Sequence, residues 1–185
     1  YCRTADELSR FYAQHGIVMV QLKGVGYSHL YPIPSHREGG DIDIYTYAAE
    51  GSGMTDAEAN ALADRLMLEK GIDVDTSHSV KHSCFTFKGI TIENHKAFLN
   101  VERYDVAPQV EKILKRCMDP QVTSLEEGQV LTPSVAFNTI FIAFHALGHF
   151  PGLLTLHHLY DWAVLIKRYG VQLPDGLTDK SLLDG

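Results

Sequence analysis

The sequence predicts an α+β fold, in which a mixed sheet with flanking helices is followed by a helical C-terminal part. Two observations predict it. Short β-branched or alternating runs occur early in the chain, and only helical patterns follow them. We therefore expect residues 1–107 to form the sheet-containing core and residues 108–185 a helical region packed on it. The 185 residues are enough to bury a substantial core.

The first part of the chain predicts a helix, a strand, a short helix and a second strand. Thr4 and Glu7 have the spacing of a capping box, with Thr4 as the N-cap of the first helix. Residues 17–22 form a β-branched run that is typical of a buried strand. A short helix is expected over residues 24–31, and residues 41–45 alternate strictly between polar and apolar side chains, as in a strand.

A third helix and a hairpin complete the expected core. Thr55 and Glu58 form another capping box, and Gly71 is well placed to end the helix that it opens. Residues 80–87 and 90–95 then predict two strands joined by a tight turn.

Helices alone are expected in the C-terminal region. Pro108 is expected to start the first of them. Thr132 and Pro133 have the pattern of an N-cap followed by a first-turn proline, which opens a strongly apolar helix to about His149. A last helix is expected to end near Gly170.

Composition limits the kinds of partner. The net charge of -7 argues against a broad electrostatic contact with nucleic acid, so a small-molecule or protein substrate is expected. The three cysteines lack metal-ligand spacing and are expected to be reduced thiols. The sequence contains neither a signal peptide nor an apolar run of about 18 residues. We therefore expect a cytoplasmic protein that does not associate with membranes.

Asp41 and Asp43 are the strongest candidates for a metal site. Residues two apart in a strand point to the same face, so both carboxylates project together while Ile42 and Ile44 enter the core. Two adjacent negative charges repel each other unless a cation lies between them. Magnesium prefers oxygen ligands, typically one or two carboxylates together with substrate phosphates, so this pair suits it.

Residues that suit phosphate binding precede the two acids. Lys23 and Gly24 lie where a strand gives way to a helix, and backbone amides at such a turn bind phosphate groups. Arg37 adds a fixed positive charge four residues before Asp41. A surface position at the strand end is an equally good interpretation of Lys23.

A third acid lies on a later strand. Glu93 and His95 share one strand face, opposite Ile90 and Ile92. If this strand is the neighbour in register of the strand that carries the aspartates, three carboxylates converge, and Glu93 can accept the proton of an attacking hydroxyl.

These motifs resemble a family of uncharacterised bacterial nucleotidyltransferases in the polymerase-β superfamily. The motifs of that family are matched here, in order, by Leu22-Lys23-Gly24, Tyr31-Pro32, Arg37 and Asp41-Ile42-Asp43. The resemblance continues through Glu93-Asn94-His95 and the helical residues His145, His149 and Asp161. Two features depart from the commoner superfamily pattern, namely the single glycine at Gly24 and a glutamate rather than an aspartate as third acid.

The resemblance implies a polymerase-β-like core and transfer of a nucleoside monophosphate from ATP or another NTP to an unidentified small-molecule or protein acceptor. The resemblance also implies a two-metal mechanism, in which the catalytic acids Asp41, Asp43 and Glu93 would bind magnesium or manganese. Lys23, Gly24, Arg37 and His95 would bind the nucleotide or substrate.

Three alternatives remain open at this point. A second Asp-x-Asp pair, Asp73 and Asp75, competes with the first, although no phosphate-binding turn precedes it and a solvated position is favoured. The chain could instead be a non-catalytic nucleotide-binding or interaction module.

The third alternative is a helical histidine-metal hydrolase. His145 and His149 are four residues apart, as are His157 and Asp161, which is a spacing that helical metal ligands use. Partly buried histidines without a metal are the favoured interpretation, because the glutamate of a metalloprotease motif is missing.

Overall fold

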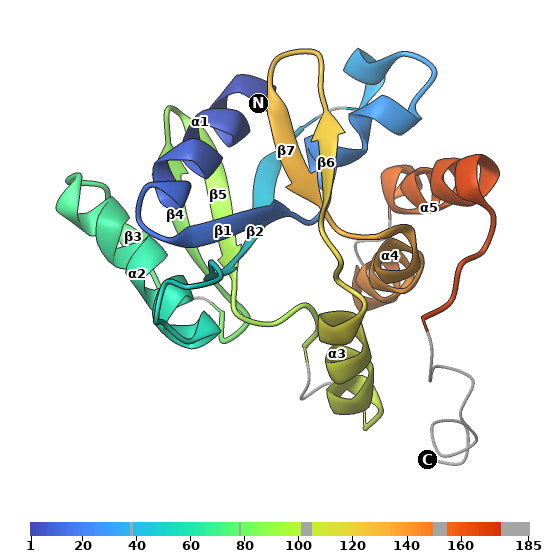
Figure 1. Ribbon diagram of the computed structural model, residues 1–185. Coiled ribbons are helices and arrows are strands. Elements are labelled where there is room, and N and C mark those ends of the chain that lie inside the picture. The colour runs from blue at the N-terminus through green and yellow to red at the C-terminus, as the bar shows by residue number, and fades with distance from the viewer. Residues whose placement is uncertain (38, 78, 101–104, 150–154, 175–185) are drawn as a thin grey trace. The chain divides into compact units, whose positions relative to one another are not determined.

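The computed structural model divides the chain into two compact units (Figure 1). The first comprises Tyr1–Lys96 with Gln121–Thr132, and the second comprises Ala97–Pro120 with Pro133–Gly185. The structure describes residues 1–37, 39–77, 79–100, 105–149 and 155–174. Among these residues no helix combines the length and the apolar character needed to cross a membrane.

A mixed seven-stranded sheet forms the centre of the first unit, with the strand order β3-β4-β5-β2-β1-β7-β6. The strands are β1 Ile17–Gln21, β2 Asp41–Ala48, β3 Val74–Asp75, β4 His82–Phe87, β5 Ile90–His95, β6 Gln121–Ser124 and β7 Gln129–Thr132. β2 pairs in parallel with β5, and β1 pairs in parallel with β7. The remaining pairs are antiparallel, including the predicted hairpin of β4 and β5.

Helices α1 (Cys2–Ala13) and α2 (Asp56–Glu69) cover one face of this sheet. Their apolar side chains pack against the strand residues that point to the same face. The buried set includes Leu8, Tyr12, Ala63 and Met67 from the helices and Ile42, Ile44 and Ile92 from the strands. Two short 3-10 helices, η1 (Gly24–Leu30) and η2 (Pro34–His36), connect β1 to β2.

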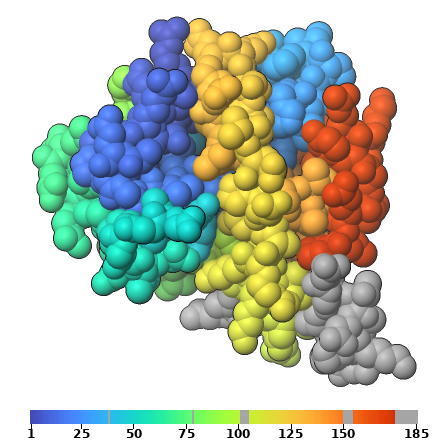
Figure 2. Space-filling view, in the orientation of Figure 1, coloured from blue at the N-terminus to red at the C-terminus, as the bar shows by residue number. Residues whose placement is uncertain are grey.

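The second unit contains the helices α3 (Ala107–Arg116), α4 (Val135–His149) and α5 (Leu156–Tyr169). Phe98, Phe137 and Phe141 form an aromatic cluster in its core, with ring centroids 4.9–6.3 Å apart. α4 packs against α5, and Trp162 of α5 donates a hydrogen bond to the Thr139 carbonyl of α4 at 3.1 Å. α5, shown in red, lies at the surface of this unit (Figure 2).

Most of the predicted elements are present. The capping box of Thr55 and Glu58 opens α2, and Gly170 follows α5 with a φ of 73°. The Thr4 cap is wrong, because α1 already begins at Cys2 and the Ala5 amide donates to the Tyr1 carbonyl.

The expectation of helices alone after the first part of the chain is also wrong. β6 and β7 form a hairpin in which β7 pairs with β1, and neither four-residue strand has the apolar alternation that would have predicted it. Gly128 in the turn has a φ of 102°, and a Cβ there would lie 2.7 Å from the Asp6 Cβ. The predicted N-cap at Thr132 is also wrong, because Thr132 is the last residue of β7. At the start of α4 it is the Ser134 hydroxyl that accepts the Phe137 amide.

We expect Thr55→Ala to destabilise the protein by about 1 kcal/mol, because the α2 N-terminus loses its side-chain acceptor. Thr55 Oγ1 accepts the Glu58 amide at 3.3 Å. Urea denaturation of wild type and variant measures the difference. Thr4→Ala is the matched control and should leave the urea midpoint nearly unchanged, since Thr4 lies inside α1. Equal losses in both variants would contradict the assigned cap.

Candidate active site

The parallel pairing of β2 and β5 brings the three predicted acids to one face of the sheet. Asp43 is the Cα partner of Glu93, and Asp41 is the partner of Thr91. Because side chains alternate along a strand, these acids lie on the face opposite Ile42 and its apolar neighbours. The register places the carboxylates together, on the side of the sheet that α1 and α2 do not cover.

Asp43 is the most enclosed of the three acids, with a fully buried side chain. The Lys23 Nζ lies 2.6 Å from its Oδ2, and the His95 Nε2 lies 3.0 Å from its Oδ1. Burial by itself raises the pKa of Asp43, but the Lys23 ammonium and the His95 hydrogen bond outweigh it and hold that pKa well below its usual range. Asp43 is therefore ionised although it is buried.

Lys23 lies between the two aspartates. Its Nζ is 3.8 Å from the Asp41 Oδ2 as well as 2.6 Å from Asp43, and its side chain is only 16% exposed. Burial lowers the pKa of the Lys23 ammonium, but Asp43 and Asp41 raise it above its usual value. Burial and the neighbouring Asp43 charge raise the pKa of Asp41, against the effect of Lys23. Lys23 is thus the cation that allows two carboxylates to share this face.

Glu93 and His95 extend the charged cluster along β5. The His95 Nε2 lies 3.5 Å from the Glu93 Oε2, and the hydrogen bond between them holds the pKa of Glu93 below its usual value, although burial opposes this. Burial lowers the pKa of His95, but its contacts with Asp43 and Glu93 raise it above the usual value.

His82 is a member of this cluster that the sequence analysis did not identify. Its Nε2 lies 3.7 Å from the Glu93 Oε2, and its ring centroid lies 5.1 Å from that of His95. Burial lowers the pKa of His82. The sequence could have identified His82, because the register of the predicted hairpin places it directly opposite His95.

A buried polar network fixes α2 on the strands that carry the acids. The Asn60 Nδ2 of α2 donates to Thr46 of β2 and to the Asn94 Oδ1 of β5, both at 3.0 Å. The Asn94 Nδ2 in turn donates to the Asp64 Oδ1 at 2.9 Å. Asn94 lies between Glu93 and His95, so these bonds hold the local register of β5 beside β2.

The turn at Gly24 brings the backbone close to β2. Gly24 has a φ of 69°, and a Cβ at this residue would lie 3.5 Å from the Asp41 carbonyl oxygen. Lys23 is the N-cap of η1, which begins at Gly24. Arg37 follows η2 and is half-buried.

The second Asp-x-Asp pair lies elsewhere in the sheet. Asp73 and Asp75 are exposed, and Asp75 is in the edge strand β3. The Asp75 Oδ1 accepts hydrogen bonds from the Ser77 amide and hydroxyl at 2.8 and 2.7 Å, so this carboxylate forms a local turn.

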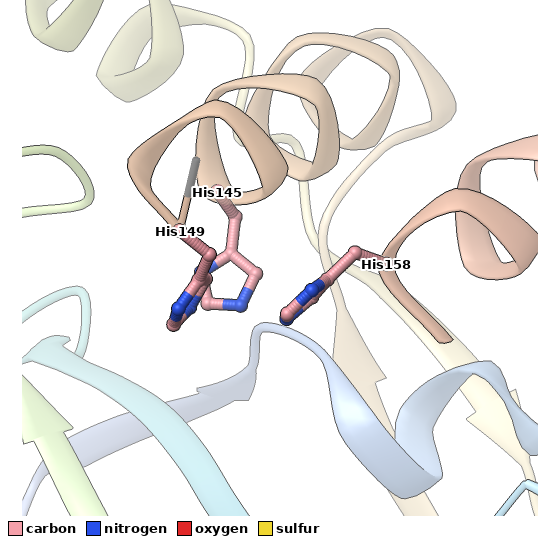
Figure 3. Close-up of side chains that lie close together, drawn as sticks. All are labelled: His145, His149 and His158. Carbon is pink, nitrogen blue, oxygen red and sulfur yellow. The ribbon is translucent and has the colours of Figure 1, made fainter. Parts of the chain in front are cut away.

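The helical histidines assemble differently from the predicted set. His145 and His149 of α4 converge with His158 of α5, and not with His157, which is exposed (Figure 3). The reason is rotational, because adjacent residues on a helix point about 100° apart. Asp161 is buried but does not belong to the group of converging ligand atoms.

The acids of the first unit fit a divalent cation. Ligand atoms of Asp43, Glu93 and His95 all lie within 4.8 Å of one another, and Asp41 is the next acid on the same face of β2. The Asp43 Oδ2 is buried and receives no well-directed hydrogen bond, although Lys23 is close to it. A carboxylate oxygen in this situation retains the capacity to bind a metal ion.

The chain is similar to known nucleotidyltransferases in sequence and in fold. The family model described as an uncharacterised nucleotidyltransferase matches residues 1–177. No curated protein sequence matches the chain.

Two solved structures have similar folds. One is the crystal structure of an antigenic nucleotidyltransferase-like protein from Paracoccidioides brasiliensis, with a TM-score of 0.61 and 11% identity over 97% of this chain and 82% of that one. The other is the solution structure of the antibiotic-resistance factor ANT(2'')-Ia, with a TM-score of 0.60 and 12% identity over 90% of this chain and 83% of that one. The chain belongs to the family of uncharacterised nucleotidyltransferases, and its mixed sheet with flanking helices is a fold that it shares with these two structures.

Proposed function

We propose that the protein transfers a nucleoside monophosphate from an NTP to an acceptor hydroxyl, with Asp41, Asp43 and Glu93 as the catalytic acids. The observation that carries the proposal is the in-register pairing of Asp43 with Glu93 on parallel strands. In the proposed reaction the acceptor oxygen bonds to the α-phosphorus, the bond to the bridging oxygen breaks, and pyrophosphate leaves.

Magnesium or manganese is the cofactor that suits these ligands. Bound by Asp41, Asp43 and Glu93, such ions would neutralise phosphate charge and activate the attacking hydroxyl. All three acids supply oxygen ligands, which hard divalent cations prefer. His95 was expected to bind the nucleotide or substrate, but its side chain is fully buried. We therefore propose a positioning role for it instead, because it donates to Asp43 and contacts Glu93 and so orients two of the proposed ligands.

Lys23 has two roles in this proposal. Without substrate, its ammonium compensates the charges of Asp41 and Asp43. Its four-carbon side chain has the freedom to turn toward a bound triphosphate, where it would neutralise phosphate oxygens. The backbone at Gly24 and the Arg37 guanidinium are the other proposed phosphate-binding groups, and Glu93 would accept the proton of the acceptor hydroxyl.

A small molecule or a protein is the proposed acceptor, because the net charge of -7 opposes a broad contact with nucleic acid. The alternative of a non-catalytic nucleotide-binding module is less favoured. The chain has both aspartates of the Asp-x-Asp pair, with Lys23 beside both of them and His95 beside Asp43.

We expect Asp41→Asn combined with Asp43→Asn to lower the rate of nucleotidyl transfer at least about a thousandfold. The reason is that the transition state loses several kcal/mol of metal-dependent stabilisation. Purified protein is incubated with magnesium, each NTP labelled in its α-phosphate, and cell extract, and transferred label is measured. Asp73→Asn combined with Asp75→Asn is the matched control and should keep wild-type activity. Label transfer that survives in the first double variant would refute the assignment of the acids.

We expect Lys23→Met to lower the free energy of unfolding by about 3 kcal/mol near neutral pH, because the buried Asp43 loses a charge partner. Lys23 keeps the folded-state pKa of Asp43 below its unfolded value. This stabilisation is therefore present above about pH 4 and is lost as the pH falls toward the folded-state pKa. The stability gap between variant and wild type should narrow on acidification.

Magnesium provides the second measurement on this variant. In thermal denaturation, magnesium should stabilise Lys23→Met more than wild type, since the cation no longer competes with the ammonium. Lys88→Met is the control, because Lys88 pairs with Glu7 on the surface, away from the acids. A variant that is as stable as wild type at every pH would contradict the compensating role of Lys23.

A further inference from the structure

Three histidine side chains of the second unit point toward one another (Figure 3). His145 and His149 lie one turn apart on α4, and His158 lies in the first turn of α5. Their ring centroids are 4.7 Å apart for His145 and His149, 5.1 Å for His145 and His158, and 4.5 Å for His149 and His158. One ring nitrogen from each lies within 4.8 Å of the others.

The packing of α4 on α5 creates this convergence. Residues four apart share a helix face, so His145 and His149 present their rings side by side. His158 meets them from the facing helix, because α5 begins at Leu156 and packs against α4. All three side chains are half-buried, which restricts their motion without removing access for a small ion.

The spacing fits a tetrahedral metal ion. Zinc bound at about 2.1 Å to three imidazole nitrogens brings those nitrogens about 3.4 Å apart and the ring centroids about 5 Å apart. The observed centroid distances of 4.5–5.1 Å are close to this value. The His149 and His158 rings are stacked at 14°, so they must rotate to direct their nitrogens at one point. Rotation about the last side-chain torsion of histidine is broad and costs little.

Thr155 identifies the nitrogen of His158 that would bind. The Thr155 amide donates to the His158 Nδ1 at 3.1 Å, and the Thr155 Oγ1 lies 3.3 Å from the same nitrogen. We therefore assign Nε2 as the ligand. In the structure Nδ1 accepts the Thr155 amide, so the ring proton is on Nε2. Binding a metal through Nε2 moves this proton to Nδ1, which gives up the amide hydrogen bond and donates to the Thr155 Oγ1 instead, the kind of support that metal-bound histidines usually have.

We propose that His145, His149 and His158 form a transition-metal site, best suited to zinc, with a fourth coordination position for water or another small ligand. The donor set consists of three imidazoles, which suit zinc and its neighbours but not magnesium. Three protein ligands with an additional position are typical of reactive rather than purely structural zinc sites. This site is additional to the proposed nucleotidyl transfer and does not depend on it.

Zinc titration tests the proposal. Untagged full-length protein is dialysed against a chelator and titrated with zinc in competition with a chromogenic indicator, in excess magnesium. We expect about one equivalent to bind, and His158→Ala to weaken its affinity at least about a hundredfold. His157→Ala is the matched control, because this neighbouring side chain is exposed and should leave the affinity unchanged. Failure of wild type to bind zinc, or equal affinities in His158→Ala and wild type, would overturn the proposal.

X-ray absorption of the zinc-loaded wild type provides a test that needs no variant. Three imidazole ligands are expected in the first coordination shell. A shell of carboxylate oxygens with one or two imidazoles would place zinc at Asp43, Glu93 and their histidines instead, and would overturn the proposal. The absorption of the cobalt-substituted protein should show the strong visible bands of tetrahedral coordination, and a weak octahedral spectrum would contradict it.

Discussion

The structure of the first unit depends on the compensation of one buried charge. Asp43 has no exposed side-chain surface, yet Lys23 and His95 keep its carboxylate ionised. An isolated carboxylate in this position would cost several kcal/mol, and it would take up a proton instead. The chain must therefore bring together Lys23 just after β1, Asp43 near the start of β2 and His95 at the end of β5. This requirement constrains how the three strands can pair.

The same constraint explains why the sheet has two different faces. On one face the apolar residues of β2 and β5 pack with α1 and α2, and the network of Asn60 and Asn94 adds directional bonds to that packing. On the other face the acids and their partners replace apolar contacts. Parallel pairing of β2 with β5 lets Asp43 face Glu93 directly, and a shift by one residue would point Glu93 into the apolar core. The helical packing on one face thus holds the carboxylates in place on the other.

Local patterns predicted the parts of this arrangement that local chemistry determines. The alternation around Asp41 and Asp43 and the capping box at Thr55 each depend on residues close in sequence, and both are present. The hairpin of β6 and β7 was missed because its strands are only four residues long and lack apolar alternation, and because its position in the sheet depends on the pairing of β7 with β1. The sequence also could not show that Lys23 lies between the aspartates, since that contact depends on how β1 meets β2.

The two clusters of potential ligands differ in a way that separates their chemistry. Asp41, Asp43 and Glu93 offer oxygen atoms and carry negative charge, which favours a hard cation accompanied by phosphates. His145, His149 and His158 offer neutral nitrogen atoms, and three of them without a carboxylate have little affinity for magnesium. The negative charges of the acids therefore need a compensating cation, which Lys23 supplies. The histidines carry no negative charge and need none. If both proposals hold, the three imidazoles would select a transition metal over magnesium, whereas His95 beside Asp43 and Glu93 leaves the acidic set open to either kind of ion.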